Sequence, residues 1–270
     1  SFLKLINMMS ERLSLALNAA FKAGEQIMKV YLTDDFEVEN KQDNSPLTKA
    51  DRLSHEIIEG FLIKTGLPII SEEGKDLIYE ERKKWSKFWM IDPIDGTKEF
   101  IKKNGEFTIN IALIEFGQPI LGVVYAPALK IIYFAEKNNG SFKVEDVNCF
   151  TELNSRVFIN LCEAVYPEVY TLVVSKSHMN KETQDFIEKK KQEHGITESK
   201  AFGSSLKICK VAEGSANCYP RFGPTMEWDT AAAHAIAKFS NCRMFEYKSL
   251  NELQYNKKTL LNPFFIVEHV

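Results

Sequence analysis

FTINIALIEFGQPILGVVYA, residues 107–126, decides the fold class of this chain. From Phe107 to Leu113 apolar side chains occupy every second position, as expected of a strand with one buried face. The turn residues 117–119 follow, and a second apolar run covers 120–125. A third run at 131–135 extends the pattern, so the stretch predicts an antiparallel meander of strands.

On the N-terminal side of the meander, the apolar residues recur at helical spacing. Residues 10–31 predict an amphipathic helix with Ser10 as its N-cap, and residues 48–66 predict a second helix that ends near a glycine. Two short apolar runs, 67–70 and 88–91, predict strands, and each run is followed at once by acids. We therefore expect helices packed against a sheet in this half.

On the C-terminal side, strand and helix patterns alternate. A strand is expected at 171–175 and a short one reaches Tyr219; helices are expected at about 180–194, at 204–213 and from about residue 228. Alternation of this kind is typical of an α/β layer. Because the pattern changes near residue 145, we expect an N-terminal α+β half at 1–145 and a C-terminal α/β half at 146–270.

Composition narrows the classes of function. The 270 residues have a net charge of -3 and 44% hydrophobic content, which indicates a soluble globular protein and disfavours a nucleic-acid polymer as partner. Five scattered cysteines contain no C-x-x-C pair, so we expect neither a zinc site nor a disulfide framework and favour a reducing cytoplasm. The opening stretch, residues 1–9, is too short to span a bilayer, and we interpret it as an extension or expression remnant.

Four acidic segments carry the candidate chemistry, although each also has a structural explanation. Asp51 stands three residues after Thr48 in a capping-box arrangement, and Asp229 in EWDTAA suits the first turn of a helix. Glu72 and Glu73 could be solvated loop residues. The turn DPIDGT, residues 92–97, is harder to explain structurally, because it places two aspartates directly after an apolar run.

Taken together, the acids predict a site for a hard divalent cation. Carboxylates and backbone carbonyls suit magnesium better than zinc, and Pro93 leaves the carbonyl of Ile94 free to add a ligand. Gly96 would let the backbone approach an anion, while Thr97 supplies a hydroxyl beside the metal. A cation, an anion cradle and a hydroxyl are what hydrolysis of a phosphate ester requires.

These motifs resemble those of a known family. SEE at 71–73, WMIDPIDGTKEF at 89–100 and EWDTAA at 227–232 are similar to the inositol monophosphatase superfamily of magnesium-dependent, lithium-sensitive phosphatases. SPLTKAD, VVSKSH, GSSLK and YPRFGPT, with Lys98-Glu99-Phe100 in place of the Thr-Asn-Phe more typical of inositol monophosphatases, resemble the 3'(2'),5'-bisphosphate nucleotidase branch, the CysQ type. The resemblance covers the chain after residue 10 and implies an αβαβα sandwich.

The resemblance also implies roles for individual residues. Glu72, Asp92 and the carbonyl of Ile94 would hold one magnesium ion, and Asp92, Asp95 and Asp229 would hold a second, with two or three ions in all. Asp51 and Thr97 would activate water. The residues that the resemblance places at the substrate are Glu72, Ile94, Asp95, Gly96, Thr97, His178, Gly203, Lys207 and Asp229. Arg221 is a further candidate for anion binding.

The implied activity is removal of the 3'-phosphate from adenosine 3',5'-bisphosphate (PAP), giving AMP and phosphate, and possible action on its sulfated analogue. Sulfur metabolism and the cytoplasm would be the setting, with peripheral contact at the inner membrane left open. Two alternatives stay open: a phosphatase for inositol mono- or polyphosphates, and a non-catalytic phosphate-binding regulator on the same fold. The oligomeric state is not predicted.

Overall fold

The first meander strands belong to a seven-stranded sheet. The computed structural model describes residues 9–33, 38–40, 46–175 and 179–270, and every structural statement below concerns these residues. The strands lie in chain order across the sheet: β3 (Ile69–Ser71), β4 (Lys87–Asp95), β5 (Thr108–Glu115), β6 (Gln118–Ala126), β7 (Ile131–Glu136), β8 (Gly140–Val144) and β9 (Ile159–Asn160). Only β3 and β4 are parallel; every other neighbouring pair is antiparallel. The predicted meander is confirmed.

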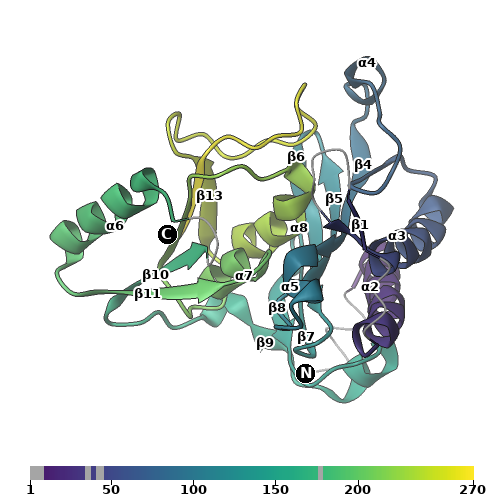
Figure 1. Ribbon diagram of the computed structural model, residues 1–270, viewed down its shortest axis with the longest axis horizontal. Coiled ribbons are helices and arrows are strands. Elements are labelled where there is room, and N and C mark those ends of the chain that lie inside the picture. Colours follow the sequence, from purple (N-terminus) through teal and green to yellow (C-terminus); the bar gives the residue numbers. More distant parts are fainter. Residues whose placement is uncertain (1–8, 34–37, 41–45, 176–178) are drawn as a thin grey trace.

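Two long helices cover one face of this sheet (Figure 1). Helix α2 (Glu11–Tyr31) begins at Ser10, whose side chain accepts a hydrogen bond from the backbone of Leu13, and α3 (Lys49–Leu62) continues into a 3-10 turn. Their apolar stripes pack on the face of β5 that carries Phe107, Ile109, Ile111 and Leu113. Both predicted helices are confirmed.

The opposite face of the sheet packs on two further helices. These are α7 (Leu206–Ala212) and α8 (Glu227–Lys238), and a five-stranded sheet lies beyond them. Its strands run in the order β11 (Thr197–Phe202), β10 (Tyr170–Ser175), β12 (Cys218–Arg221), β14 (Phe265–His269) and β13 (Cys242–Glu246). Gly122 of β6 lets α8 approach closely, because a Cβ there would lie 2.2 Å from the carbonyl oxygen of Ala232. This contact fixes α8 above the sheet.

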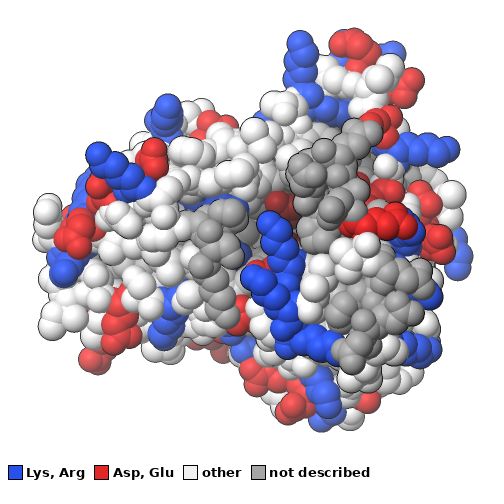
Figure 2. All heavy atoms as spheres, viewed as in Figure 1, with Lys and Arg blue, Asp and Glu red and all other residues white. Residues whose placement is uncertain are grey.

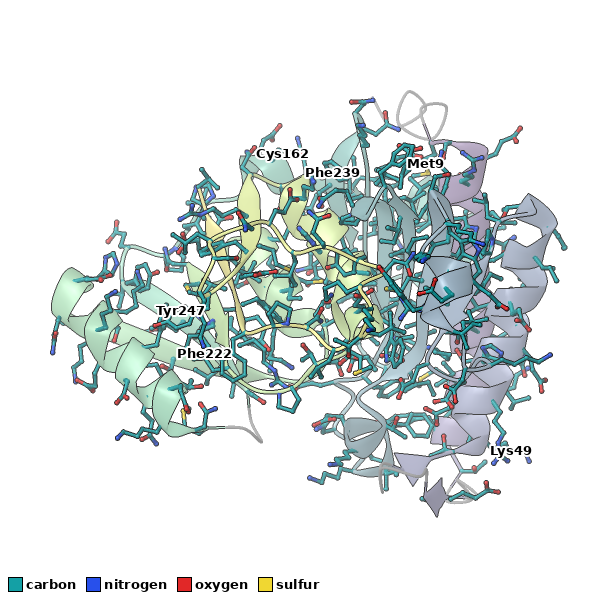
Figure 3. All side chains as sticks on the ribbon, turned by 90° about the horizontal axis from the view of Figure 1, so that it is seen from above. Met9, Lys49, Cys162, Phe222, Phe239 and Tyr247 are labelled. Carbon is teal, nitrogen blue, oxygen red and sulfur yellow. The ribbon has the colours of Figure 1, made fainter. Side chains whose placement is uncertain are left out.

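Helix α6 (Lys181–His194) forms the outermost layer, over the far face of the second sheet. Phe186 of α6 packs on Phe222, which in turn contacts Tyr247 with ring centroids 4.7 Å apart (Figure 3). The order of layers is helices, sheet, helices, sheet, helix. The predicted αβαβα sandwich is confirmed.

Short elements complete the chain and bring the acidic segments into place. They are the two-stranded pair β1 (Glu39–Asn40) and β2 (Pro46–Leu47), α4 (Tyr79–Arg82), α5 (Thr97–Ile101) and 3-10 turns at Ile63–Thr65, Phe150–Ser155 and Leu161–Glu163. Among the described helices, none combines the length and apolar character needed to cross a membrane.

The structure corrects several predicted boundaries. Strand β4 does not stop before the acids but runs on to Asp95, because a register shift between Asp92 and Asp95 keeps the chain paired with β5. Strand β11 was not predicted, since its residues are mostly exposed and polar. Pairing of β8 with β9 carries the first sheet to residue 160, past the pattern change at 145. The division into halves at 145 therefore stays a prediction.

Candidate active site

The turn DPIDGT lies where β4 leaves the sheet. Asp92 is buried, and its Oδ1 accepts a hydrogen bond from the backbone N–H of Ile94, 3.1 Å away. Gly96 has φ +91°, a conformation that favours glycine, and this lets the chain turn directly into α5. The predicted turn is therefore an irregular strand end followed by a five-residue helix.

Asp51 caps a helix, as its sequence context predicted, and its carboxylate also contacts Thr97. Its Oδ2 accepts hydrogen bonds from the backbone N–H and the hydroxyl of Thr48, at 2.8 and 2.5 Å, which caps α3. Its Oδ1 accepts one from the hydroxyl of Thr97 at 3.2 Å. The two side chains are 46 positions apart in sequence and meet because α3 packs beside the end of β4. One carboxylate thus caps a helix and also contacts Thr97.

Asp229 reaches the same place from α8. Its Oδ2 accepts the backbone N–H of Met226 at 2.9 Å, so the predicted first-turn helix role is present. One carboxylate oxygen from each of Asp92, Asp95 and Asp229 lies within 4.8 Å of the others. Glu72, which follows β3, is close enough to interact with Asp92. The structure brings together four acids from three separate segments.

Burial disfavours the ionised forms of Asp92, Asp95 and Asp229, and mutual repulsion adds to this for Asp92 and Asp229. Desolvation raises the pKa of Asp92 well above its usual value, and the neighbouring charges of Glu72 and Asp95 raise it further. Desolvation and Asp95 likewise raise the pKa of Asp229. Burial also raises the pKa of Asp95, although Lys207 and Ser205 act in the opposite direction. A bound divalent cation would reverse this penalty, and the carboxylate-rich donor set suits magnesium.

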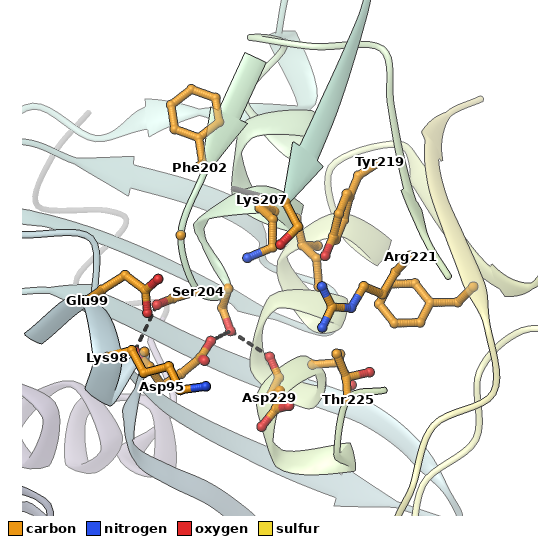
Figure 4. A pocket seen from close by; sticks show the side chains of 17 residues that line it. Asp95, Lys98, Glu99, Phe202, Ser204, Lys207, Tyr219, Arg221, Thr225 and Asp229 are labelled. Atoms are coloured by element: carbon orange, nitrogen blue, oxygen red, sulfur yellow. Dashed lines mark hydrogen bonds between the residues drawn. The ribbon is translucent and has the colours of Figure 1, made fainter. Parts of the chain in front are cut away.

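A cavity of about 320 Å³ opens beside the acids, and its far side is basic. Lys207 and Arg221 both line it and are each only 9% exposed (Figure 4). Desolvation lowers the pKa of Lys207 to about 8, with Asp95 opposing that shift. Arg221 donates to the carbonyl of Pro224 at 2.8 Å. The space-filling view shows the surface hollowed near the centre, with basic side chains beside the hollow (Figure 2).

Of the remaining predicted site residues, Gly203 and Ile94 lie near the cavity or the acids, and His178 is not among the described residues. Gly203 lines the cavity, and its N–H donates to Oε2 of Glu106 at 2.6 Å. The carbonyl oxygen of Ile94 lies 3.4 Å from the Thr97 hydroxyl, as an alternative acceptor to Asp51 for its single proton. His178 lies outside the described residues, as do residues 1–8 of the apolar opening stretch.

The hydroxyls of the two serines that follow Gly203 bond within the protein. Ser204 donates to backbone carbonyls, including that of Asp95, and Ser205 contacts the Asp95 carboxylate. Asn110, which donates to Ser205, was also missed. Its signal was available, because Asn110 is a polar residue that stands between the apolar Ile109 and Ile111 of a strand.

Comparisons with known proteins place the chain in a family. The sequence profile of the inositol monophosphatase family matches residues 8–263. The chain belongs to this family. The resemblance of its acidic motifs to that superfamily is thereby confirmed.

Individual relatives are similar over nearly the whole chain. A Salmonella typhimurium protein named 3'(2'),5'-bisphosphate nucleotidase CysQ is 44% identical over 252 residues, which are 92% of this chain and 96% of that protein. The crystal structure of CysQ from Bacteroides thetaiotaomicron is 43% identical, with a TM-score of 0.88 over 97% of this chain and 98% of that one. Both relatives support the predicted branch of the family.

A more distant solved structure shares the fold alone. It is an IMPase/NADP phosphatase complexed with Mg2+ and phosphate, 19% identical with a TM-score of 0.70, and the match covers 92% of this chain and 86% of that one.

Proposed function

We propose that this protein is a 3'(2'),5'-bisphosphate nucleotidase, a phosphoric monoester hydrolase that converts PAP to AMP and phosphate and also acts on the sulfated analogue. The observation that carries the proposal is the cavity itself, where the acids Asp95 and Asp229 lie opposite the buried cations Lys207 and Arg221. A substrate with two phosphates needs both a cation-binding side and a basic side. The names of the relatives that match over 92% of the chain support the same substrate class.

The chain's oxygen ligands fit magnesium. Glu72, Asp92 and the carbonyl of Ile94 would hold one ion, and Asp92, Asp95 and Asp229 would hold another; the number of ions, two or three, is part of the proposal. When bound, magnesium supplies positive charge that stabilises the transferring phosphoryl group and lowers the pKa of water. The desolvated acids have few positive partners of their own, which supports this assignment.

Asp51 and Thr97 would handle the proton of the attacking water. The Thr97 hydroxyl donates to Asp51 Oδ1, so its oxygen lone pairs are available to accept a hydrogen bond from water. A proton leaving the water can pass to the threonine oxygen while the threonine proton moves to the carboxylate. The cap on Asp51 Oδ2 fixes the carboxylate while this happens.

The basic side would bind the phosphate that does not react. Lys207 and Arg221 are held at the cavity wall by burial, so their charges need little reorganisation on binding. Gly96 and Gly203 would let the ligand approach the backbone. His178 completes the proposed substrate set from the sequence resemblance alone.

A panel of phosphate-release assays tests the proposal. With magnesium present, we expect the highest kcat/KM for PAP, compared with AMP, inositol 1-phosphate and fructose 1,6-bisphosphate. Asp95→Asn is the matched variant, and it should abolish turnover of every substrate. A preference for inositol 1-phosphate would overturn the substrate assignment. Equal release by Asp95→Asn would overturn the assignment of the site.

Three finer proposals come from the same resemblance. Lithium should inhibit the reaction, the enzyme should act in sulfur metabolism, and it should work in the cytoplasm. Lithium titration of PAP hydrolysis checks the first, since absence of inhibition would contradict it. Growth of a deletion strain with and without reduced sulfur checks the second, and fractionation of cells checks the third and any peripheral contact with the inner membrane.

A further inference from the structure

The hydroxyl of Ser205 is the meeting point of three elements. It contacts Asp95 Oδ2 at 2.8 Å and the carbonyl oxygen of Asp229 at 2.6 Å, and the amide nitrogen of Asn110 lies 2.8 Å from it. These partners belong to β4, α8 and β5, while Ser205 precedes α7. Ser205 and Asn110 are 3% and 1% exposed, so water does not compete for the bonds.

The direction of the hydrogen bonds follows from counting protons. Thr108 donates its hydroxyl to Oδ1 of Asn110 at 3.1 Å, which turns the amide nitrogen of Asn110 toward Ser205. The Ser205 oxygen therefore accepts from Asn110, and its single proton is left for Asp95 or Asp229. An ionised carboxylate attracts that proton more strongly than a helix carbonyl does, since charge-assisted bonds are about twice as strong. The proton therefore points to Asp95 when that acid is charged.

The neighbouring serine holds the backbone of the same aspartate. The Ser204 hydroxyl contacts the carbonyl oxygens of Asp95 and Glu106, at 2.8 and 2.7 Å. Ser204 has φ +49°, a left-handed conformation that is unfavourable for a non-glycine residue. Gly96 makes room for it, since a Cβ there would lie 2.2 Å from the Ser204 oxygen. Asp95 is thus fixed at both its main chain and its carboxylate.

We infer that Ser205, oriented by Asn110, is a positioning residue that holds Asp95 Oδ2 so that the other carboxylate oxygen faces the cation. The inference rests on the proposed function only in taking Asp95 as a magnesium ligand. In this inference Ser205 acts through Asp95 and not by contact with the cation or the substrate. Because Ser205 and Lys207 lie two residues apart, the start of α7 both places Lys207 on the basic side of the cavity and orients the ligand on its acidic side.

The test measures magnesium binding without any substrate. In Ser205→Ala we expect the Kd for Mg2+ to rise about 10-fold or more, as is found when groups that orient metal ligands are removed. The Kd is obtained from the rise of the thermal midpoint on titration with MgCl2. The matched control is Ser141→Ala, because Ser141 is also buried and its hydroxyl has no partner among the described residues. This control should bind Mg2+ like the wild type.

A double-mutant cycle distinguishes orientation from general packing. Asn110→Ala should weaken Mg2+ binding in the same direction as Ser205→Ala, and adding it to Ser205→Ala should weaken binding no further, because the Asn110 amide acts through the serine. Ser205→Thr keeps the hydroxyl and should restore much of the affinity. Thermal midpoints measured in EDTA show whether each variant folds without the metal. If Ser205→Ala does not fold, the Kd for Mg2+ of Asn110→Ala is compared with that of the wild type instead.

Two outcomes would overturn the inference. One is an unchanged Kd for Mg2+ in both Ser205→Ala and Asn110→Ala; the other is a loss that is fully additive in the double variant. Neither readout depends on which phosphate ester the enzyme cleaves. If PAP is not the substrate, the proposed function fails while the Mg2+ titration still decides the role of Ser205.

Discussion

Glu213 and Asp92 are both buried carboxylates, but the protein surrounds them differently. Four donors meet Glu213: the hydroxyl of Tyr133 at 2.7 Å and Lys143 at 2.7 Å, with Lys210 and Ser215 both at 2.6 Å. Burial alone would raise the pKa of Glu213, but the two lysines outweigh it and lower the pKa to about 2. The charge is neutralised within the chain.

Asp92 is surrounded instead by other acids. The pKa of Asp92 is raised well above its usual value. Desolvation is the largest cause, and the charges of Glu72, Asp95 and Asp229 raise the pKa further. Two lysines contact Glu213, whereas the strongest charge effects on Asp92 come from other acids, and Lys207 and Arg221 act only on Asp95 and Asp229, across the cavity. A buried charge left without its counter-ion destabilises the fold, which indicates that the counter-ion comes from outside. The Glu213 network serves stability, and the acidic cluster serves cation binding.

The largest expected effect comes from breaking the acidic cluster. Asp92→Asn should lower PAP hydrolysis by more than about 100-fold, beyond the effect of groups that merely orient ligands. In EDTA the same variant should be as stable as the wild type or more so, because one of four like charges is gone. Steady-state kinetics measure the rate of PAP hydrolysis, and thermal melts in EDTA measure the stability without metal. Retained turnover would show that the cluster is not catalytic.

At Glu213 we expect a loss of stability with little change in activity. Glu213→Gln should lower the free energy of unfolding by about 3 kcal/mol, because it leaves two partly buried lysines without their carboxylate. Its kcat/KM should stay within a few-fold of the wild type. Urea denaturation measures the loss, and Glu25→Gln is the control, since its ion pairs with Lys22 and Lys29 are exposed and worth under about 1 kcal/mol. Equal stability of the two variants would remove the contrast.

A single titration with magnesium should distinguish the Glu213 network from the acidic cluster, because only the cluster is expected to bind the ion. At one hundred times its Kd, Mg2+ should stabilise the wild type by about 2.7 kcal/mol. Glu213→Gln starts from a lower midpoint and should rise by the same amount, whereas Asp92→Asn should hardly rise. Thermal midpoints measured in MgCl2 and in EDTA give the stabilisation by Mg2+ for the wild type and for both variants. A normal rise in Asp92→Asn would place the cation elsewhere.

The sequence predicted the acidic cluster better than the network that fixes it. The three acids could be found because Asp92 and Asp95 come directly after an apolar run and Asp229 suits the first turn of a helix. The contacts of Ser205 and Asn110 could not be found in this way, since they join residues 95 positions apart whose spacing carries no period. The Glu213 network likewise draws on β7, β8 and α7.

The same physical limit explains two of the errors in the fold. Period-two and helical patterns report a buried face, so β5, α2 and α8 were predicted from their apolar residues. Strand β11 is an edge of its sheet and has little buried face, and so it gave no such pattern. Strand β4 was predicted too short, because the carboxylates of Asp92 and Asp95 mimic the polar end of a strand although the backbone stays paired.

The smallest expected effect is a pH dependence at Glu213. Its pKa in the folded protein is about 2, below the value of 4.5 for a free glutamate. A lowered pKa gives stability that is fully present above pH 4.5 and is lost as the pH falls toward 2. The difference in unfolding free energy between the wild type and Glu213→Gln should therefore be constant from pH 7 to about pH 5.5 and shrink below pH 4.5. Urea denaturation at several pH values, in EDTA to exclude the acidic cluster's cation, measures this difference. A difference that grew on acidification would mean that Glu213 is protonated in the folded protein, and the contrast with Asp92 would then be lost.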